Sequence, residues 1–229
     1  MRAVGVHPDV IVVVSQVWRT TCTAIRSGEE GFVVDSPVLP AELDALPALL
    51  EQSRFPVSGL LATHADWDHL LGRLAFPDAA LGVAETTAAR LRAEPGAAAR
   101  DLREFDAGWY LERPRPLSLG SVQALPVPGH VEAGGRELEL HPADGHTPDG
   151  MAVLVPWAGV LCAGDYLSPV EEPMVDSPDA YLATLRRLRE LAGRAETVVP
   201  GHGEPMSRAA ALEVLDRHEA TVSGRGRSR

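Results

Sequence analysis

The sequence predicts an α/β fold, an αββα four-layer sandwich in which two mixed β-sheets pack face to face and helices cover their outer faces. Each half of the 229-residue chain begins with short apolar runs typical of strands and continues with a helix that has one apolar side. The hydrophobic fraction of 45% supplies a full core. We therefore expect one domain over residues 1–222 and a disordered basic tail over residues 223–229.

In the first half, apolar runs bounded by turn residues predict strands at 10–14, 20–25, 32–35, 59–62 and 80–83. Asp44 is expected to cap a helix that carries Pro47 in its first turn. Further helices are expected at 70–76, 85–93 and 97–105.

The segment 106–116 contains Trp109, Tyr110 and two prolines and is expected to be a loop. Two interpretations of its aromatic residues remain open: they cover the site described below, or they seal the core.

In the second half, strands are expected at 122–127, 137–141, 151–155, 160–163 and 197–199. Leu138 and Leu140 alternate with glutamates, which predicts one buried face. Ser177-Pro178 is a helix start, with proline at the first helical position. Ser207 is expected to cap a last helix that runs to about residue 220.

Composition excludes several classes of function. The net charge of -11 argues against nucleic acid as a partner, because phosphate binding needs a basic surface. All 21 basic residues are arginine, and the absence of lysine excludes Schiff-base chemistry and a Walker P-loop. No apolar run is long enough to span a membrane. We expect a small-molecule substrate, no nucleic-acid or membrane partner, and a monomer or homodimer.

Cys22 and Cys162 lie inside apolar runs and are interpreted as small buried residues. Nothing requires a disulfide, so a reducing compartment fits. The run 10–14 is too short for a signal peptide, and the expected location is the cytoplasm.

One stretch, 63–69, organises the chain. Residues able to bind a metal are concentrated there, directly after the predicted strand 59–62: His64, Asp66, Asp68 and His69. Such a cluster alone would also fit a polar turn. Three more ligand-type residues follow other predicted strands: His146, Asp165 and His202. Imidazole nitrogen and carboxylate oxygen bind zinc and iron, and α/β folds place sites at strand ends, so the set predicts a metal site.

These residues resemble the motifs of the metallo-β-lactamase fold superfamily. The motifs are His64-Ala65-Asp66-Trp67-Asp68-His69, Gly145-His146-Thr147-Pro148, Gly164-Asp165 and Pro200-Gly201-His202. Their order and separations match the family over most of the chain. One position departs from the common pattern, because Asp66 stands where a second histidine is expected.

The resemblance implies two divalent metal ions, most often zinc. The first ion would be held by His64, Asp66 and His146. The second would be held by Asp68, His69 and His202, with Asp165 as the bridge between the two ions. A hydroxide between the metals is the implied nucleophile, oriented by Asp68. Tyr166 has two interpretations: a donor to the substrate oxyanion, or a packed residue at a strand end.

The negative charge of Asp66 lowers the net positive charge of a metal-loaded site and favours a harder ion. The preference for iron or manganese over zinc is therefore expected to increase. Flavodiiron proteins of the same superfamily carry a glutamate at this position and hold iron. Three arrangements remain open: a dinuclear site with Asp66 as a ligand, a mononuclear site with Asp66 outside the coordination sphere, and a degenerate site.

The predicted function is a metal-dependent hydrolase that cleaves a small-molecule ester, thioester or lactone. Two alternatives remain: an iron-dependent oxidoreductase similar to persulfide dioxygenases, and a metal-binding relative without turnover. Other polar residues receive weaker predictions. Asp35 is interpreted as a supporting group, His141 as a hydrogen-bond partner near His146, His130 as a solvated loop residue, His218 as a surface residue, and Glu171 as a solvated acid near the site.

Overall fold

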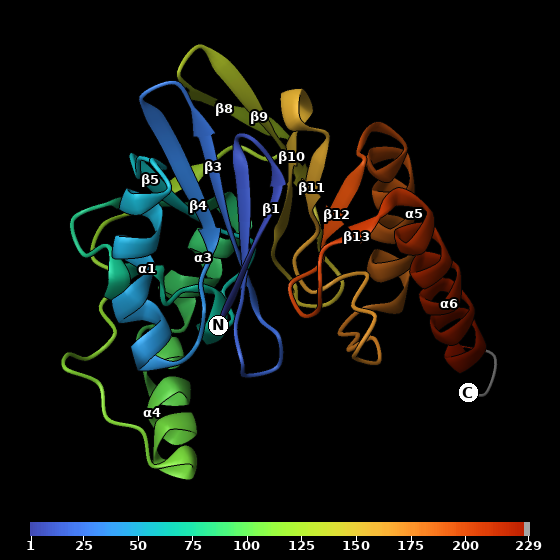
Figure 1. The fold of residues 1–229 in the computed structure, drawn as a ribbon. Helices are drawn as coiled ribbons and strands as arrows, with labels where there is room; N and C mark the ends of the chain where they lie inside the picture. The colour runs from blue at the N-terminus through green and yellow to red at the C-terminus, as the bar shows by residue number, and fades with distance from the viewer. Residues whose placement is uncertain (227–229) are drawn as a thin grey trace.

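A computed structural model describes residues 1–226 of the chain, and residues 1–224 together with their side chains. Two sheets, of seven and six strands, lie face to face with helices on both outer sides (Figure 1). The predicted αββα sandwich is therefore confirmed. None of the helices in this part of the chain is both long and apolar enough to cross a membrane.

The first sheet contains the strands in sequence order from β1 to β7. They are β1 (Arg2–His7), β2 (Val10–Val14), β3 (Thr21–Ser27), β4 (Glu30–Asp35), β5 (Gly59–Ala62), β6 (Ala80–Ala84) and β7 (Val122–Leu125). Pairing is antiparallel from β1 to β4 and parallel from β4 to β7. The parallel connections carry α1 (Pro40–Gln52), the 3-10 turn η1 (Trp67–His69), α2 (Gly72–Ala75), α3 (Glu85–Ala93) and α4 (Ala97–Trp109).

The second sheet has the order β13-β12-β11-β10-β9-β8. Its strands are β8 (Gly129–Ala133), β9 (Arg136–Pro142), β10 (Met151–Val155), β11 (Val160–Cys162), β12 (Thr197–Val199) and β13 (Met206–Ser207). The 3-10 turn η2 (Pro156–Ala158) joins β10 to β11. The outer face is covered by α5 (Pro178–Arg194) and α6 (Arg208–Gly226) (Figure 1).

Side-chain alternation along the strands divides the core into three parts. Val12 of β2 and Leu138 and Leu140 of β9 pack between the sheets. Val13, which follows Val12, faces the helices of the first sheet instead. A third core lies between the second sheet and its two helices. Each fully buried aliphatic side chain stabilises this arrangement by roughly 1.5–3 kcal/mol, so the strand ends are held by rigid layers.

Three strands were not predicted. β1 and β8 are edge strands with little burial, and β13 is an edge strand of two residues, so none of them has the run of buried apolar residues that marks the inner strands. His130 therefore lies on an exposed strand rather than in the predicted loop.

Several helix boundaries differ from the prediction; α2, for example, covers Gly72–Ala75 instead of 70–76. The helix expected after Asp44 begins earlier, at Pro40, because Glu42 at its third position accepts a hydrogen bond from the Leu39 amide and closes the first turn. Pro47 consequently lies in the helix interior. α4 extends through Trp109, into the segment expected to be a loop, and Trp109 stacks on Phe105 of the same helix. Tyr110 is 94% exposed and does not seal the core.

α6 continues through Gly226 instead of ending near residue 220, and its side chains Val214 and Val222 are buried in the outer core of the second sheet. Residues 223–226 of the expected disordered tail are thus helical, and residues 227–229 lie outside the described residues. Cys22 and Cys162 are buried and free, as predicted.

Candidate metal centre

The predicted ligand residues leave the ends of strands from both sheets at one edge of the sandwich. His64 follows β5, Asp165 follows β11 and His202 follows β12, whereas η1 carries Asp68 and His69. The backbone links these ends directly: the Met151 amide donates to the Thr63 carbonyl at 2.7 Å, and the Gly201 amide donates to the Gly164 carbonyl at 2.6 Å. The first bond joins the two sheets and the second joins neighbouring strand ends of the second sheet, and together they fix the relative positions of the side chains.

Asp165 lies at the centre of the set. Its Oδ2 is 3.3 Å from the Nε2 atoms of both His146 and His202, and 3.7 Å from Nε2 of His64. Its Oδ1 is 3.0 Å from Nε2 of His69. All four histidines thus face a single carboxylate.

The other carboxylates divide the histidines into two groups. In the first group, Asp66 Oδ2 is 3.4 Å from His64 Nε2 and 3.7 Å from His146 Nε2. In the second group, Asp68 Oδ2 is 3.6 Å from His69 Nε2 and 3.5 Å from His202 Nε2. Within each group, one ligand atom per residue lies within 4.8 Å of the others. The structure brings together all seven residues that the sequence suggested as ligands.

The donor set fits a metal centre. The buried Nε2 atoms of His64, His69 and His146 have no hydrogen-bond partner among the described residues, and neither does Asp165 Oδ1. Buried polar atoms without a partner are costly, and a cation between them would satisfy all of these atoms together. Imidazole nitrogen with carboxylate oxygen suits zinc, iron and manganese.

The opposite ring nitrogen of each histidine faces a supporting oxygen. Nδ1 of His64 lies 3.1 Å from Thr63 Oγ1, and Nδ1 of His69 lies 3.1 Å from Asp35 Oδ2. Nδ1 of His146 and of His202 face the backbone carbonyls of Met174 and Trp18, at 3.0 and 3.2 Å. A proton held on Nδ1 leaves the Nε2 lone pair directed to the centre, which is how ligand histidines are commonly oriented.

Asp35 has the supporting position expected of it. Its carboxylate accepts hydrogen bonds from the amide and hydroxyl of Thr63, at 2.8 and 3.0 Å, in addition to facing His69. Its backbone has φ of 58°, a left-handed conformation that costs free energy in a non-glycine residue. Asp35 therefore connects His69 of the second ligand group to Thr63, which in turn contacts His64 of the first group.

Two glycines of the motifs have steric roles. A Cβ atom at Gly201 would collide with Asp165 Oδ1. Gly145 has φ of 115° and lies against the backbone of Tyr181, where any side chain would clash. These close approaches bring His202 and His146 to their positions.

The charges of the cluster are strongly coupled. Burial alone would lower the pKa of His146, but the carboxylates of Asp165 and Asp66 outweigh burial and raise it to about 10. The pKa of His69 is raised in the same way by Asp165, Asp68 and Asp35. Burial would raise the pKa of Asp66, and the neighbouring histidines lower it instead. Without a metal the site therefore attracts protons, and a divalent ion would have to displace them.

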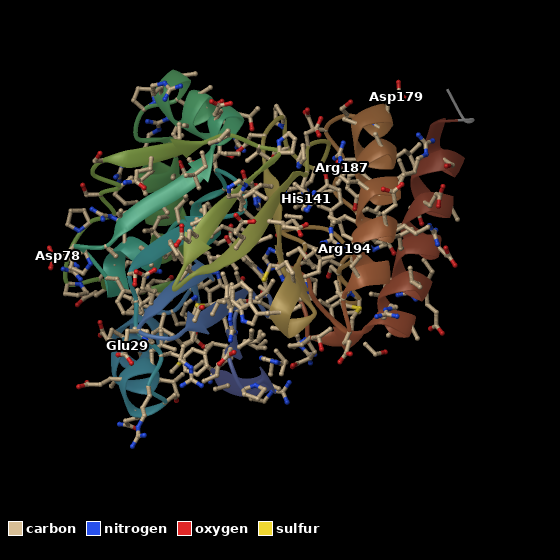
Figure 2. All side chains as sticks on the ribbon, turned by 90° about the horizontal axis from the view of Figure 1, so that it is seen from above. Glu29, Asp78, His141, Asp179, Arg187 and Arg194 are labelled. Atoms are coloured by element: carbon tan, nitrogen blue, oxygen red, sulfur yellow. The ribbon has the colours of Figure 1, made fainter. Side chains whose placement is uncertain are left out.

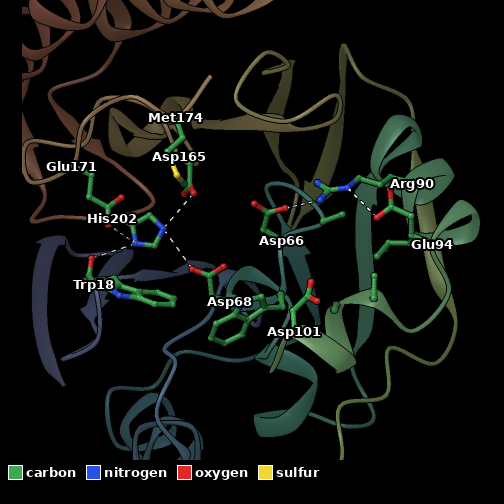
Figure 3. A pocket seen from close by; sticks show the side chains of 15 residues that line it. Trp18, Asp66, Asp68, Arg90, Glu94, Asp101, Asp165, Glu171, Met174 and His202 are labelled. Carbon is green, nitrogen blue, oxygen red and sulfur yellow. Dashed lines mark hydrogen bonds and ion pairs between the residues drawn. The ribbon is translucent and has the colours of Figure 1, made fainter. Parts of the chain in front are cut away.

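A cavity of about 400 Å³ opens onto the cluster. Asp66, Asp68, Asp165 and His202 reach it from the metal centre, and its walls include Trp18, Trp67, Leu91 and Met174. Figure 3 shows Asp66 and Arg90 on one side, and His202, Glu171 and Met174 on the other. The cluster is thus accessible to a small molecule.

Three residues of the site were not predicted. Trp18 lies in a turn between two strands, and its ring lines the cavity while its carbonyl supports His202. An aromatic residue in a short polar turn was an available signal. Arg90 and Asp149 form ion pairs beside Asp66. Asp149 follows the Gly-His-Thr-Pro motif closely, whereas nothing in the sequence distinguishes Arg90 from the other arginines.

Tyr166 lies behind the metal centre. Its side chain is 2% exposed, and its hydroxyl donates to the Asp144 carbonyl at 2.6 Å while accepting from the His146 amide at 2.9 Å. Burial raises its pKa. Because both hydrogen-bonding directions are used by the backbone, Tyr166 supports the turn that carries His146. The packed-tyrosine interpretation fits this placement, and a role as oxyanion donor does not.

The remaining polar candidates lie at varied distances from the centre. His141 contacts Glu139 at 3.1 Å and lies near Arg187 and Arg194, so it does not support His146 as suggested (Figure 2). His218, predicted at the surface, is 5% exposed, with Nε2 3.2 Å from the Ser168 carbonyl. Among the weaker candidates, Glu171 does line the cavity, with Oε1 3.9 Å from His202 Nδ1.

A family model described as the metallo-beta-lactamase superfamily matches residues 16–202. The structure is similar to that of a metallo-beta-lactamase family protein from Thermus thermophilus, with a TM-score of 0.71 and 22% identity over 94% of this chain and 81% of that one. It is also similar to a beta-lactamase domain protein from Burkholderia ambifaria (TM-score 0.69, 21% identity, 95% of this chain and 75% of that one). A third similar structure is a metallo-beta-lactamase from Pontibacter korlensis (TM-score 0.65, 16% identity, 94% and 97%).

The structural likenesses show a shared fold, and the family model spans most of the chain, including every motif residue named above. In agreement with the resemblance noted from the sequence, the chain belongs to the metallo-beta-lactamase superfamily.

Proposed function

We propose that the protein is a metal-dependent hydrolase that cleaves a small-molecule ester, thioester or lactone. One observation carries the proposal: buried Nε2 atoms of three histidines have no hydrogen-bond partner among the described residues and face carboxylates, three of which line a cavity. Two groups of ligand atoms around a shared Asp165 support a centre for two ions. Membership of a superfamily that uses divalent metals supports the same conclusion.

Bound divalent ions would supply a water molecule acidic enough to attack at neutral pH and would polarise the substrate oxygen. The protein contributes orientation and proton transfer. The Asp68 side chain is 9% exposed and lines the cavity, so its carboxylate can reach both the centre and a bound substrate. In our proposal it accepts a proton from the attacking water and passes it to the leaving oxygen or sulfur.

The cavity walls favour a neutral or positively charged substrate. Glu94, Asp101 and Glu171 line the cavity beyond the metal centre. Arg90 carries the only permanent positive charge among the described residues that line it, and both of its terminal nitrogens are paired with carboxylates. A carboxylate on the substrate would find no free cation on these walls, whereas Trp18 offers an aromatic face to a cation.

The test of the mechanism is Asp68→Ala, assayed on neutral esters, thioesters and lactones with and without a chelator. We expect turnover to fall by roughly 10²–10⁴-fold, the usual contribution of a proton-transfer group. Asp101→Asn is the matched control, because Asp101 lines the same cavity outside both ligand groups. Turnover of Asp68→Ala equal to that of the control would contradict the proposed role.

The charge preference is tested with two esters that differ only in a quaternary ammonium or a carboxylate group. We expect the cationic ester to have the higher kcat/KM, and Asp101→Asn to reduce this difference. A higher kcat/KM for the anionic ester would contradict the proposed charge preference while leaving the hydrolase proposal intact.

A second candidate function is favoured by the position of Asp66. Its carboxylate lies with His64 and His146, and a carboxylate in the donor set improves the fit to iron. An iron-dependent oxidoreductase acting on persulfides would consume oxygen and retain about one iron per chain. A metal-binding relative without turnover would show neither hydrolysis nor oxygen consumption.

A further inference from the structure

We propose that Arg90 is a positioning residue, which holds Asp66 as a one-oxygen ligand and thereby determines the affinity of the first ligand group for its metal ion. This inference rests on the proposed metal centre and adds a residue that lies outside all of its motifs.

Arg90 connects Asp66 to a buried anchor. Its Nη2 lies 2.8 Å from Asp66 Oδ1, and its Nη1 lies 2.9 Å from Asp149 Oδ1 (Figure 3). Asp149 is 1% exposed, and its Oδ2 accepts a hydrogen bond from the Ala65 amide at 3.0 Å. Ala65 immediately precedes Asp66 in the chain. The guanidinium therefore closes a loop of contacts that fixes both the backbone and the side chain of Asp66.

Asp66 needs such a partner more than the other ligand residues do. Its side chain is 30% exposed, whereas those of His64 and His146 are 3% and 6% exposed. Each histidine is oriented by an oxygen facing its Nδ1, but Asp66 has no second ring nitrogen to be held in this way. Arg90 occupies Oδ1 and leaves Oδ2 facing the histidines at 3.4 and 3.7 Å.

The geometry requires arginine. A planar guanidinium can bind two carboxylates at once with fixed directions, while the ammonium of lysine is a single point charge on a flexible chain. Glu94, which directly follows the last residue of α3, lies 3.9 Å from Arg90 Nε and restrains the same side chain. Without Arg90, Asp66 would be free to turn to solvent or to bind an ion through both oxygens.

The experiment is a zinc titration of metal-free protein, followed by the visible spectrum of the cobalt(II) form, for wild type and Arg90→Gln. Partners of ligands contribute roughly 10–100-fold to metal affinity. In Arg90→Gln we expect the affinity for one of the two ions to fall by this factor, while the affinity for the other ion is unchanged. The cobalt(II) spectrum of the weakened site should also change. Arg92→Gln is the matched control, because Arg92 is exposed on the same helix and has no partner among the described residues.

A double-mutant cycle separates positioning from a structural role. Asp66→His removes the group that Arg90 is proposed to orient, and this change alone should raise zinc affinity. In the Asp66→His background, Arg90→Gln should change zinc affinity little. An equal loss in both backgrounds would overturn the proposal. If Arg90→Gln does not fold, Asp149→Asn removes the anchor instead, and an unchanged affinity in that variant would also overturn it.

The outcomes for wild type keep the two proposals apart. Wild type that binds no ion would contradict the proposed function. If wild type binds two ions and Arg90→Gln binds both with the same affinities as wild type, only the inference about Arg90 is contradicted.

Discussion

The two ligand groups of the metal centre are held in different ways. Asp68, His69 and His202 have side chains that are 9%, 0% and 6% exposed, and their supports are the buried Asp35 and the backbone of Trp18. The other group contains Asp66, which is 30% exposed and is oriented by a side chain from α3. The difference teaches that the packing of the sheets positions one ligand group, whereas the other group depends on a partly exposed ion pair and is easier to alter.

The largest change should come from breaking both groups at once. Asp165→Ala removes the only described carboxylate that faces all four ligand histidines. We expect metal content to fall clearly below two ions per chain, because each group would keep three donors but both would lose the ligand that they share. Elemental analysis after gel filtration measures this, with Asp176→Ala, an exposed aspartate of the segment that leads to α5, as the control. Normal metal content in Asp165→Ala would refute the shared centre.

A smaller effect is expected from a variant that weakens the second ligand group more than the first. Asp35→Asn removes the charge beside His69 Nδ1. We expect the second ion to bind roughly 10–100-fold more weakly, since this is the usual contribution of a group that supports a metal ligand. The first ion should change less and serves as the internal control in the same titration. Equal weakening of both ions would mean that Thr63, which also contacts Asp35, transmits the change to His64.

The smallest effect concerns the turn that supports His202. Buried Glu42 accepts hydrogen bonds from the Ser15 hydroxyl at 2.6 Å and the Gln16 amide at 2.9 Å, which holds the turn containing Trp18. Burial would raise the pKa of Glu42, but these hydrogen bonds lower it overall. Glu42→Gln should reduce the free energy of unfolding by about 1–3 kcal/mol at neutral pH.

The sign of the pH dependence follows from the lowered pKa. A carboxyl group whose pKa is lower in the folded state contributes its full stability above its unfolded pKa, and this contribution is lost as pH falls through the folded value. Wild type should therefore lose stability on acidification below about pH 4.5 more steeply than Glu42→Gln does. Urea unfolding at several pH values tests this, with the exposed Glu51→Gln on the same helix as control. Parallel profiles for wild type and Glu42→Gln would contradict the assignment.

Local sequence patterns predicted the strands and strand ends that depend on the residues of a single segment. The strands that deliver His64, Asp165 and His202 are buried apolar runs, and their ends could be located because a motif residue follows each closely. β1, β8 and β13 were missed because these edge strands bury few side chains.

Tertiary contacts determined the rest. The pairing of Arg90 with Asp66 and Asp149 joins residues from three separate segments, and no periodicity marks it. Tyr166 is a case in which a local sequence pattern suggested a role that the tertiary structure does not allow. Its position directly after Asp165 suggested catalysis, but the fold turns its hydroxyl toward the backbone of Asp144.

In our proposal, the seven ligand residues gathered at Asp165 form one centre for two ions. The most direct measurement is elemental analysis of the protein purified without added metal, compared with Asp165→Ala prepared in parallel. We expect about two divalent ions per chain in wild type and clearly fewer in the variant. Wild type without bound metal after supplementation with zinc, iron and manganese, or equal metal content in both proteins, would contradict the proposed centre.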